Sequence, residues 1–126
     1  MRENNRGKLY SVDNFKALDP SIKDFLIRGN VRDRWELIIG DIREVLPNLL
    51  SRLQSVDFFY HDLCNSHHLK LFEISTVVPY LNKNGYLASH CSITLLFEKD
   101  ALKNICKKYN LEYNIFRDIA IGYNQS

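Results

Sequence analysis

The chain has 126 residues, of which 45% are hydrophobic and 25% are charged, as is ordinary for a soluble globular protein. The net charge of +2 and the scattered basic residues argue against a nucleic-acid partner, which needs a clustered basic stripe. No apolar run is long enough to cross a membrane, and the polar N-terminus is unlike a signal peptide. Three cysteines without close pairing indicate reduced thiols in a cytoplasmic protein. We expect one domain, residues 1–126, that is short for a complete doubly wound enzyme.

Apolar runs and helical segments alternate along almost the whole chain. Runs that are apolar throughout and separated by helices are typical of a parallel sheet covered on both faces. The last two segments alternate polar and apolar residues, which predicts an antiparallel pair at the sheet edge. The sequence therefore predicts an α/β fold, a Rossmann-like three-layer sandwich of mostly parallel strands with an antiparallel C-terminal edge. The predicted strands are 8–13, 36–40, 56–60, 86–89, 112–116 and 119–123, and the predicted helices are 21–28, 47–53, 66–78 and 98–109.

Proline positions and apolar spacing define the helices further. Because proline disrupts a helix interior, we place Pro47 in the first turn of its helix and treat residues 42–46 as the approach. The following helix should end before Pro79, since the residue before a proline avoids helical geometry. The predicted buried faces are Ile42, Val45, Leu46, Leu49, Leu50 and Leu53 around the second helix, Leu71, Phe72, Ser75 and Val78 in the third, and Ala101, Leu102, Ile105 and Cys106 in the fourth.

Polar residues follow the carboxyl ends of the predicted parallel strands. In open α/β sheets, ligands bind beyond these ends, so we expect the functional site at this edge. The alternative for the acids is a structural role, because Asp is common as a helix N-cap or turn residue after a strand. The residues concerned are Asp13, Gly40, Asp41, His61, Asp62 and His90.

Four segments, in this order, resemble the class I S-adenosylmethionine-dependent methyltransferases. The similarity is greatest to small-molecule O-methyltransferases whose fourth strand ends in His-Asp followed by Asp-His-Ser. It implies S-adenosyl-L-methionine as the cofactor and transfer of a methyl group to an oxygen of a small-molecule acceptor. The segments are Leu-Tyr-Ser-Val-Asp (9–13), Arg-Trp-Glu-Leu-Ile-Ile-Gly-Asp-Ile-Arg-Glu-Val-Leu-Pro (34–47), Val-Asp-Phe-Phe-Tyr-His-Asp (56–62) and Val-Pro-Tyr-Leu-Asn-Lys-Asn-Gly-Tyr-Leu (78–87).

The resemblance implies a role for each matching residue. Asp13 corresponds to the acid that accepts hydrogen bonds from the cofactor ribose, a charge-assisted pairing. Gly40 and Asp41 correspond to the turn near the adenine amino group. His61 and Asp62 correspond to the strand end beside the transferred methyl group. His61 is the better candidate for the catalytic base because histidine titrates near neutrality, and Asp62 would orient it or the acceptor.

The metal site of metal-dependent relatives is poorly matched. Where those relatives have Asp-x-Asp-His-Ser, this chain has Asp62-Leu63-Cys64-Asn65-Ser66, so an acid and a histidine are replaced. Their acid after the fifth strand is replaced by His90 here. A hard divalent cation prefers several oxygen ligands, so we predict no metal, with Asp62 and His90 as weak candidates.

We find no counterpart of the family's first strand and glycine-rich cofactor loop, since residues 1–6 before Gly7 contain no apolar run and no glycine pair. In the family's sheet this strand lies between those matched by 9–12 and 56–60. Unpaired edges promote association, so we expect these edges to close on each other, to self-associate or to take a strand from a complementing chain. The alternative to an enzyme is therefore a catalytically inactive remnant that serves as a binding or assembly module.

Overall fold

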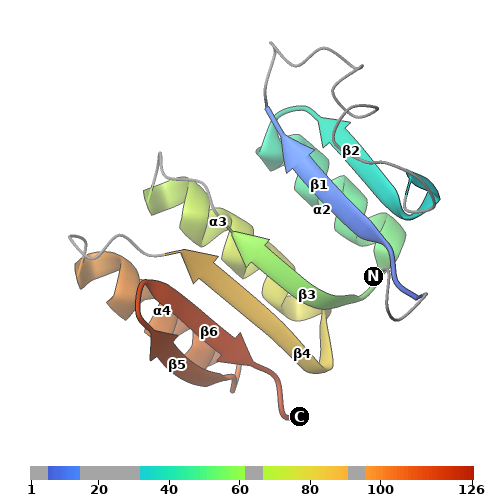
Figure 1. Cartoon of the computed structure of the whole chain (residues 1–126). Coiled ribbons are helices and arrows are strands. Elements are labelled where there is room, and N and C mark those ends of the chain that lie inside the picture. The colour runs from blue at the N-terminus through green and yellow to red at the C-terminus, as the bar shows by residue number, and fades with distance from the viewer. Residues whose placement is uncertain (1–5, 15–31, 62–66, 91–95) are drawn as a thin grey trace. The chain divides into compact units, whose positions relative to one another are not determined.

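The computed structural model describes residues 6–14, 32–61, 67–90 and 96–126, with backbone alone for residues 32, 67 and 96–100 (Figure 1). The predicted helix over 21–28 lies outside these residues. The chain divides into two compact units, residues 1–46 and 47–126. No helix in the described part of the chain is long and apolar enough to span a membrane.

The first unit is built on two parallel strands, β1 (Leu9–Asp13) and β2 (Trp35–Ile39), with a short 3-10 helix, η1 (Arg32–Arg34), before β2. Their register pairs Leu9 with Trp35 and Asp13 with Ile39. The Trp35 indole Nε1 donates to Ser11 Oγ at 2.9 Å, which ties the strands together through their side chains. Because the pairing is parallel, both carboxyl ends lie at the same edge.

Helix α2 (Ile42–Leu53) contains Pro47 in its interior, so the prediction that 42–46 only approach the helix was wrong. Pro47 lacks the N–H that would bond to the Arg43 carbonyl, a defect that costs about 3 kcal/mol. Burial of a leucine side chain contributes about 1.5–3 kcal/mol, so a face of several leucines outweighs the lost bond. The predicted apolar face is confirmed for Leu46, Leu49 and Leu50, which are 3%, 7% and 2% exposed.

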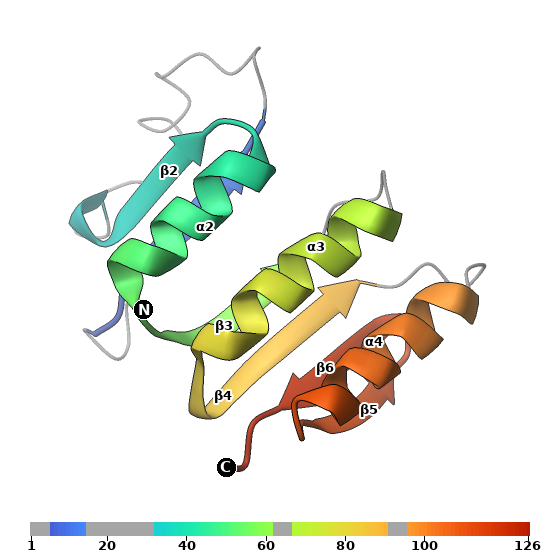
Figure 2. The same ribbon diagram turned by 180° about the vertical axis from the view of Figure 1, so that it is seen from behind.

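The second unit is a four-stranded sheet in the order β3-β4-β6-β5. Strands β3 and β4 are parallel and the other two pairs are antiparallel, which confirms the predicted α/β fold and its C-terminal edge. Helices α3 and α4 lie on one face of this sheet, toward the viewer in Figure 2. The elements are β3 (Val56–His61), α3 (His67–Val77), the 3-10 helix η2 (Val78–Tyr80), β4 (Leu81–His90), α4 (Leu96–Lys108), β5 (Glu112–Phe116) and β6 (Ile119–Tyr123).

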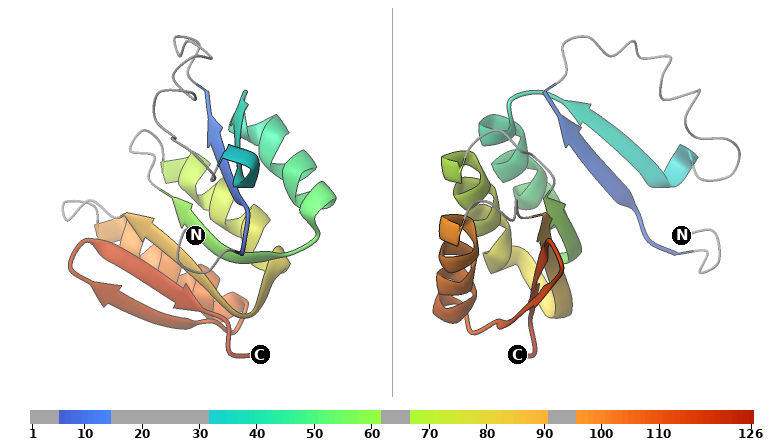
Figure 3. Two further views of the ribbon diagram at one scale, coloured as in Figure 1. Left: turned by 45° about the vertical axis from the view of Figure 1, so that its right-hand side comes forward. Right: turned by 60° about the vertical axis from the view of Figure 1, so that its left-hand side comes forward.

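The core of the second unit lies between the two helices and the sheet face that they cover. The right-hand view of Figure 3 shows α3 and α4 layered on that face. The predicted inward positions of α4 are confirmed for Leu102 and Cys106, which are 1% and 0% exposed. Burial raises the pKa of the Cys106 thiol to about 11, so this cysteine is an inert packing residue. The cluster is Ile74, Val78, Leu81, Leu87, Leu102, Cys106, Leu111 and Ala120.

The buried face of α3 differs from the predicted one. Ser75 is exposed and Leu71 and Phe72 are only partly buried, whereas two charged residues are inside. Charged residues enter a core only where partners compensate for lost water, and such partners are invisible in a hydrophobic pattern. The buried residues of α3 and η2 are Lys70, Glu73, Ile74, Val77 and Val78.

Strand β4 begins at Leu81, five residues before the predicted start at Tyr86. Its register with β3 shifts between Val56↔Leu81 and Phe58↔Tyr86, so β4 carries extra residues there. Asn84 takes up the irregularity with a φ of 64°. A side chain at Gly85 would put a Cβ atom 2.8 Å from a backbone oxygen, so only glycine fits.

Strands β1 and β3 belong to different sheets. In the described part of the chain each has one hydrogen-bonded neighbour, β2 and β4 respectively. These are the two strands between which the family's first strand was expected from the sequence. Which groups pair with the edge N–H and C=O groups of β1 and β3 stays a prediction.

Candidate functional site

The three predicted cofactor-binding residues lie together at the carboxyl edge of the first unit. The backbone N–H of Gly40 donates to the Asp13 carbonyl at 2.9 Å, so the chain after β2 stays beside the end of β1. Asp41 follows directly and begins α2. The parallel register thus brings Asp13, Gly40 and Asp41 to one place. That they bind the cofactor stays a prediction.

Asp41 is the N-cap of α2, the structural role that the sequence left open. Its Oδ1 accepts from the backbone N–H of Arg43 at 2.9 Å, and its carbonyl accepts from the amides of Glu44 and Val45 at 3.0 and 2.9 Å. The Arg43 guanidinium also binds it, with Nη2 2.7 Å from Oδ2. Hydrogen bonds from the Arg43 side chain and then from its amide lower the pKa of Asp41 to about 2. Asp41 is therefore an ionised cap.

Gly40 has a steric reason of its own to be glycine. A Cβ atom there would lie 2.7 Å from Cγ2 of Val45 in the first turns of α2. Val45 is β-branched and has little rotamer freedom in a helix, so it cannot move aside at low cost. The glycine allows α2 to start immediately after β2, which fixes the position of Asp41 beside the end of the strand.

His61, the predicted base, lies at the carboxyl end of β3 with its side chain inside the second unit. Its Nε2 is 2.5 Å from Oε2 of Glu73 on α3, and each side chain is 2% exposed. The contact is close, but its angles are not those of a good hydrogen bond. Within the described residues, His61 Nδ1 and Glu73 Oε1 have no hydrogen-bond partner. The buried His61 imidazole and the buried Glu73 carboxyl group therefore compensate for their lost hydration mainly through contact with each other.

Two further buried polar residues lie on the elements next to this pair. Ser89 is the register partner of His61 on β4 and is fully buried. Lys70, 5% exposed, donates from Nζ to the His90 carbonyl at 2.7 Å. Ser89, Lys70, His61 and Glu73 are buried polar residues of α3 and of the carboxyl ends of β3 and β4, and we call them the polar cluster. The sequence did not reveal Lys70 or Glu73 as site residues; the available signal was that both share a helical face with Ile74 and Val77.

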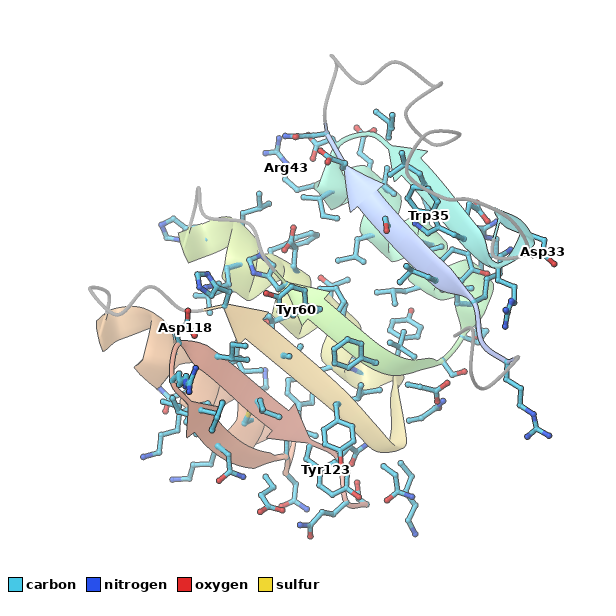
Figure 4. All side chains as sticks on the ribbon, in the orientation of Figure 1. Asp33, Trp35, Arg43, Tyr60, Asp118 and Tyr123 are labelled. Carbon is cyan, nitrogen blue, oxygen red and sulfur yellow. The ribbon has the colours of Figure 1, made fainter. Side chains whose placement is uncertain are left out.

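His90, a weak metal candidate, contacts a residue that no sequence pattern indicated. Its Nε2 lies 2.9 Å from Oδ2 of Asp118, in the turn between β5 and β6 (Figure 4). The hydrogen bond with His90 holds the pKa of the Asp118 carboxyl below its usual range, and a hydrogen bond with the Asp118 backbone lowers it further. Asp62, the other candidate, lies outside the described residues. Among those described, no group of three or more His, Cys, Asp or Glu residues is placed to hold a metal ion.

The mutual dependence of His61 and Glu73 is testable. We expect Glu73→Ala to lower the free energy of unfolding by about 3–5 kcal/mol, because one member of a buried pair is left uncompensated. The double variant His61→Leu/Glu73→Leu should lose less, since it removes both polar groups together. Urea denaturation measures both, with the exposed Glu112→Ala as control. A double variant that loses at least as much as Glu73→Ala would contradict this account.

Comparison with known proteins places this architecture in a family. A family model described as a methyltransferase domain matches residues 1–90. No curated protein matches the chain by sequence. Two solved structures are similar at 18% identity each: the TDP-rhamnose 3'-O-methyltransferase of calicheamicin biosynthesis, with a TM-score of 0.68, and the MycE methyltransferase of the mycinamycin pathway, solved with Mg and SAH, with a TM-score of 0.66. The fibrillarin pre-rRNA processing protein of Methanococcus jannaschii, at 17% identity, gives a TM-score of 0.57.

The chain is only part of the length of these proteins. The match covers 92% of this chain and 57% of the calicheamicin enzyme, and 94% of this chain and 35% of the mycinamycin enzyme. Matches at this identity establish the fold, and the family model covers well over half of the 126 residues. The chain therefore belongs to the methyltransferase domain family and has the Rossmann-like fold of its class I members.

Proposed function

We propose that the chain is part of an S-adenosylmethionine-dependent methyltransferase that moves a methyl group to an oxygen of a small molecule. Membership of the methyltransferase family supports the reaction class. The O-methyltransferase named among the structural neighbours supports oxygen as the acceptor atom. The observation that carries the proposal is the convergence of Asp13, Gly40 and Asp41, held by the hydrogen bond from Gly40 to Asp13.

These residues fit the adenosine half of the cofactor. A carboxylate at the end of β1 is suited to the two ribose hydroxyls, because each hydroxyl can donate to one of its oxygens. Asp41 already binds Arg43 through both oxygens, so contact with the adenine amino group would use its remaining lone pairs. When bound, S-adenosylmethionine supplies an electrophilic methyl group on sulfur. No glycine-rich loop for its methionine half is present in the described residues.

The geometry supports a different role for His61 from that of the base. A catalytic base must come within about 2.6–3.2 Å of the acceptor proton, or reach it through one water. The His61 side chain faces α3 and is 2% exposed, so an acceptor outside the protein does not reach it. We propose that His61, with Glu73, anchors the carboxyl end of β3 and does not act as the base.

The second candidate function is a non-catalytic module that keeps the methyltransferase fold. It is favoured by the burial of the predicted base, because the His61 side chain is 2% exposed and contacts Glu73. The two candidates differ in cofactor affinity, because only an enzyme needs the edge formed by Asp13 and Gly40 to bind adenosine.

Calorimetry with S-adenosylmethionine tests the proposed cofactor site. We expect binding no tighter than high micromolar, since the candidate partners among the described residues all belong to the adenosine half. Asp13→Ala should remove most of it, because the lost charge-assisted hydrogen bonds are worth roughly 1.5–3 kcal/mol. Asp41→Ala should cost less affinity. The control is Asp33→Ala, whose carboxylate lies before β2 at the opposite end of the strands. Equal and negligible effects at Asp13 and Asp41 would leave both as structural acids.

Added Mg²⁺ should not stabilise the protein. The His90 imidazole is engaged with Asp118, and Asp62 alone offers one carboxylate. A site of this kind binds too weakly for millimolar Mg²⁺ to shift the unfolding midpoint through mass action. Thermal unfolding with Mg²⁺ and with a chelator measures the difference. A clear rise in the melting temperature with Mg²⁺ would instead support a metal-dependent reaction through Asp62.

A further inference from the structure

Arg43 is a charged residue at the carboxyl edge of the first unit to which the proposed function gives no role. It is the second residue of α2, and Figure 4 shows it beside the arrowhead of β1. Three hydrogen bonds join it to Asp41: its backbone N–H and its Nε donate to Oδ1 at 2.9 and 3.1 Å, and its Nη2 donates to Oδ2 at 2.7 Å. The guanidinium therefore lies against the carboxylate through two parallel bonds, as in a bidentate ion pair.

The stability of the fold does not require this ion pair. The side chains of Arg43 and Asp41 are 70% and 44% exposed, and ion pairs between exposed side chains contribute little to stability. The N-cap bond of α2 comes from the backbone N–H of residue 43, which every residue except proline supplies. The guanidinium is therefore available for a role outside the capping of the helix.

The hydrogen bonds leave an acceptor and a donor side by side. A carboxylate has about four lone-pair positions, two on each oxygen. Within the described part of the chain, Oδ1 of Asp41 accepts two hydrogen bonds and Oδ2 accepts one, so the remaining lone pair is on Oδ2. Nη2 of Arg43 carries two N–H groups and uses one of them for this bond. An acceptor on Oδ2 and a donor on Nη2 are therefore left for a ligand, on atoms 2.7 Å apart.

The direction of these two groups defines the chemistry that they recognise. Both atoms are trigonal, so in a bidentate pair the unused lone pair of Oδ2 and the unused N–H of Nη2 point to the same side, away from Oδ1 and Nε. The matching ligand is planar and has a donor next to an acceptor. In adenine, the edge farthest from the ribose has this pattern, because the 6-amino group lies next to the N1 lone pair.

We propose that Arg43 is a specificity-determining residue of the cofactor site, whose Nη2 donates to N1 of adenine while Oδ2 of Asp41 accepts from the 6-amino group. The inference rests on the proposed function, which brings adenosine to this edge, and it adds a side-chain partner for N1. A 6-oxo purine presents an acceptor and an N–H in the reverse order, so it places like groups against both atoms. Because the ion pair exists before the ligand arrives, Arg43 need not be ordered on binding.

Nuclear magnetic resonance titrations with adenosine and with 1-deazaadenosine, which lacks the N1 acceptor, test this role in the wild type and in Arg43→Met. The wild type should bind 1-deazaadenosine about fivefold more weakly or worse, because a hydrogen bond from a charged donor is lost. Arg43→Met should bind the two nucleosides with affinities within about twofold, since the partner of N1 is then absent in both cases. Methionine keeps the backbone N–H that Asp41 caps, so circular dichroism should show an intact fold.

The matched control is Arg52→Met in the last turn of α2, which should keep the wild-type difference between the two nucleosides. A wild type that binds both nucleosides equally, or an Arg43→Met variant that keeps the difference, would overturn the role of Arg43 and leave the adenosine site in place. Tighter adenosine binding by Arg43→Met would also overturn it, because Arg43 would then compete with adenine for Asp41. If neither nucleoside moves the amide signals of Asp13 and Gly40, the proposed cofactor site itself is wrong, and this inference with it.

Discussion

Parallel strand pairing is the constraint on which the rest of this structure depends. Two paired parallel strands end at the same edge of a sheet. Residues that follow these strands are therefore close in space even when they are distant in the sequence. The pairing of β1 with β2 brings Asp13 to Gly40 and Asp41, and the pairing of β3 with β4 sets His61 beside Ser89. Each pair places candidate site residues at its carboxyl edge. Among the described strands, β1 and β2 have only each other as neighbours, and β3 has only β4.

The two edges differ in how their polar groups are stabilised. At the first, Asp41 is ionised and at the surface, where Arg43 and the start of α2 bind it. At the second edge, His61 and Glu73 are buried, so contact between their side chains replaces contact with water. A surface acid can add a ligand to its existing contacts, whereas a buried pair must be disrupted to do so. This contrast is why the first edge is the better candidate for binding and the second for rigidity.

Much of this arrangement could be read from the sequence, and the failures have physical causes. Apolar runs and their spacing predicted β5 and β6 with correct bounds, and the leucine face of α2. Local rules failed where tertiary contacts outweighed them. The leucine face of α2 tolerates Pro47 inside the helix, and Gly85 allows an irregular start to β4. Glu73 was missed because a hydrophobic pattern assigns every charged residue to the surface unless its partner is known.

Nuclear magnetic resonance with S-adenosylhomocysteine tests the central claim, that the carboxyl edge of the first unit is an adenosine site. The account predicts that millimolar ligand shifts the backbone amide signals of Asp13, Gly40 and Asp41 together, with one binding isotherm. Signals of the second unit's antiparallel strands, such as Asn114 and Ile121, should stay unchanged. Saturable shifts confined to the second unit, or no shifts at any residue, would contradict it.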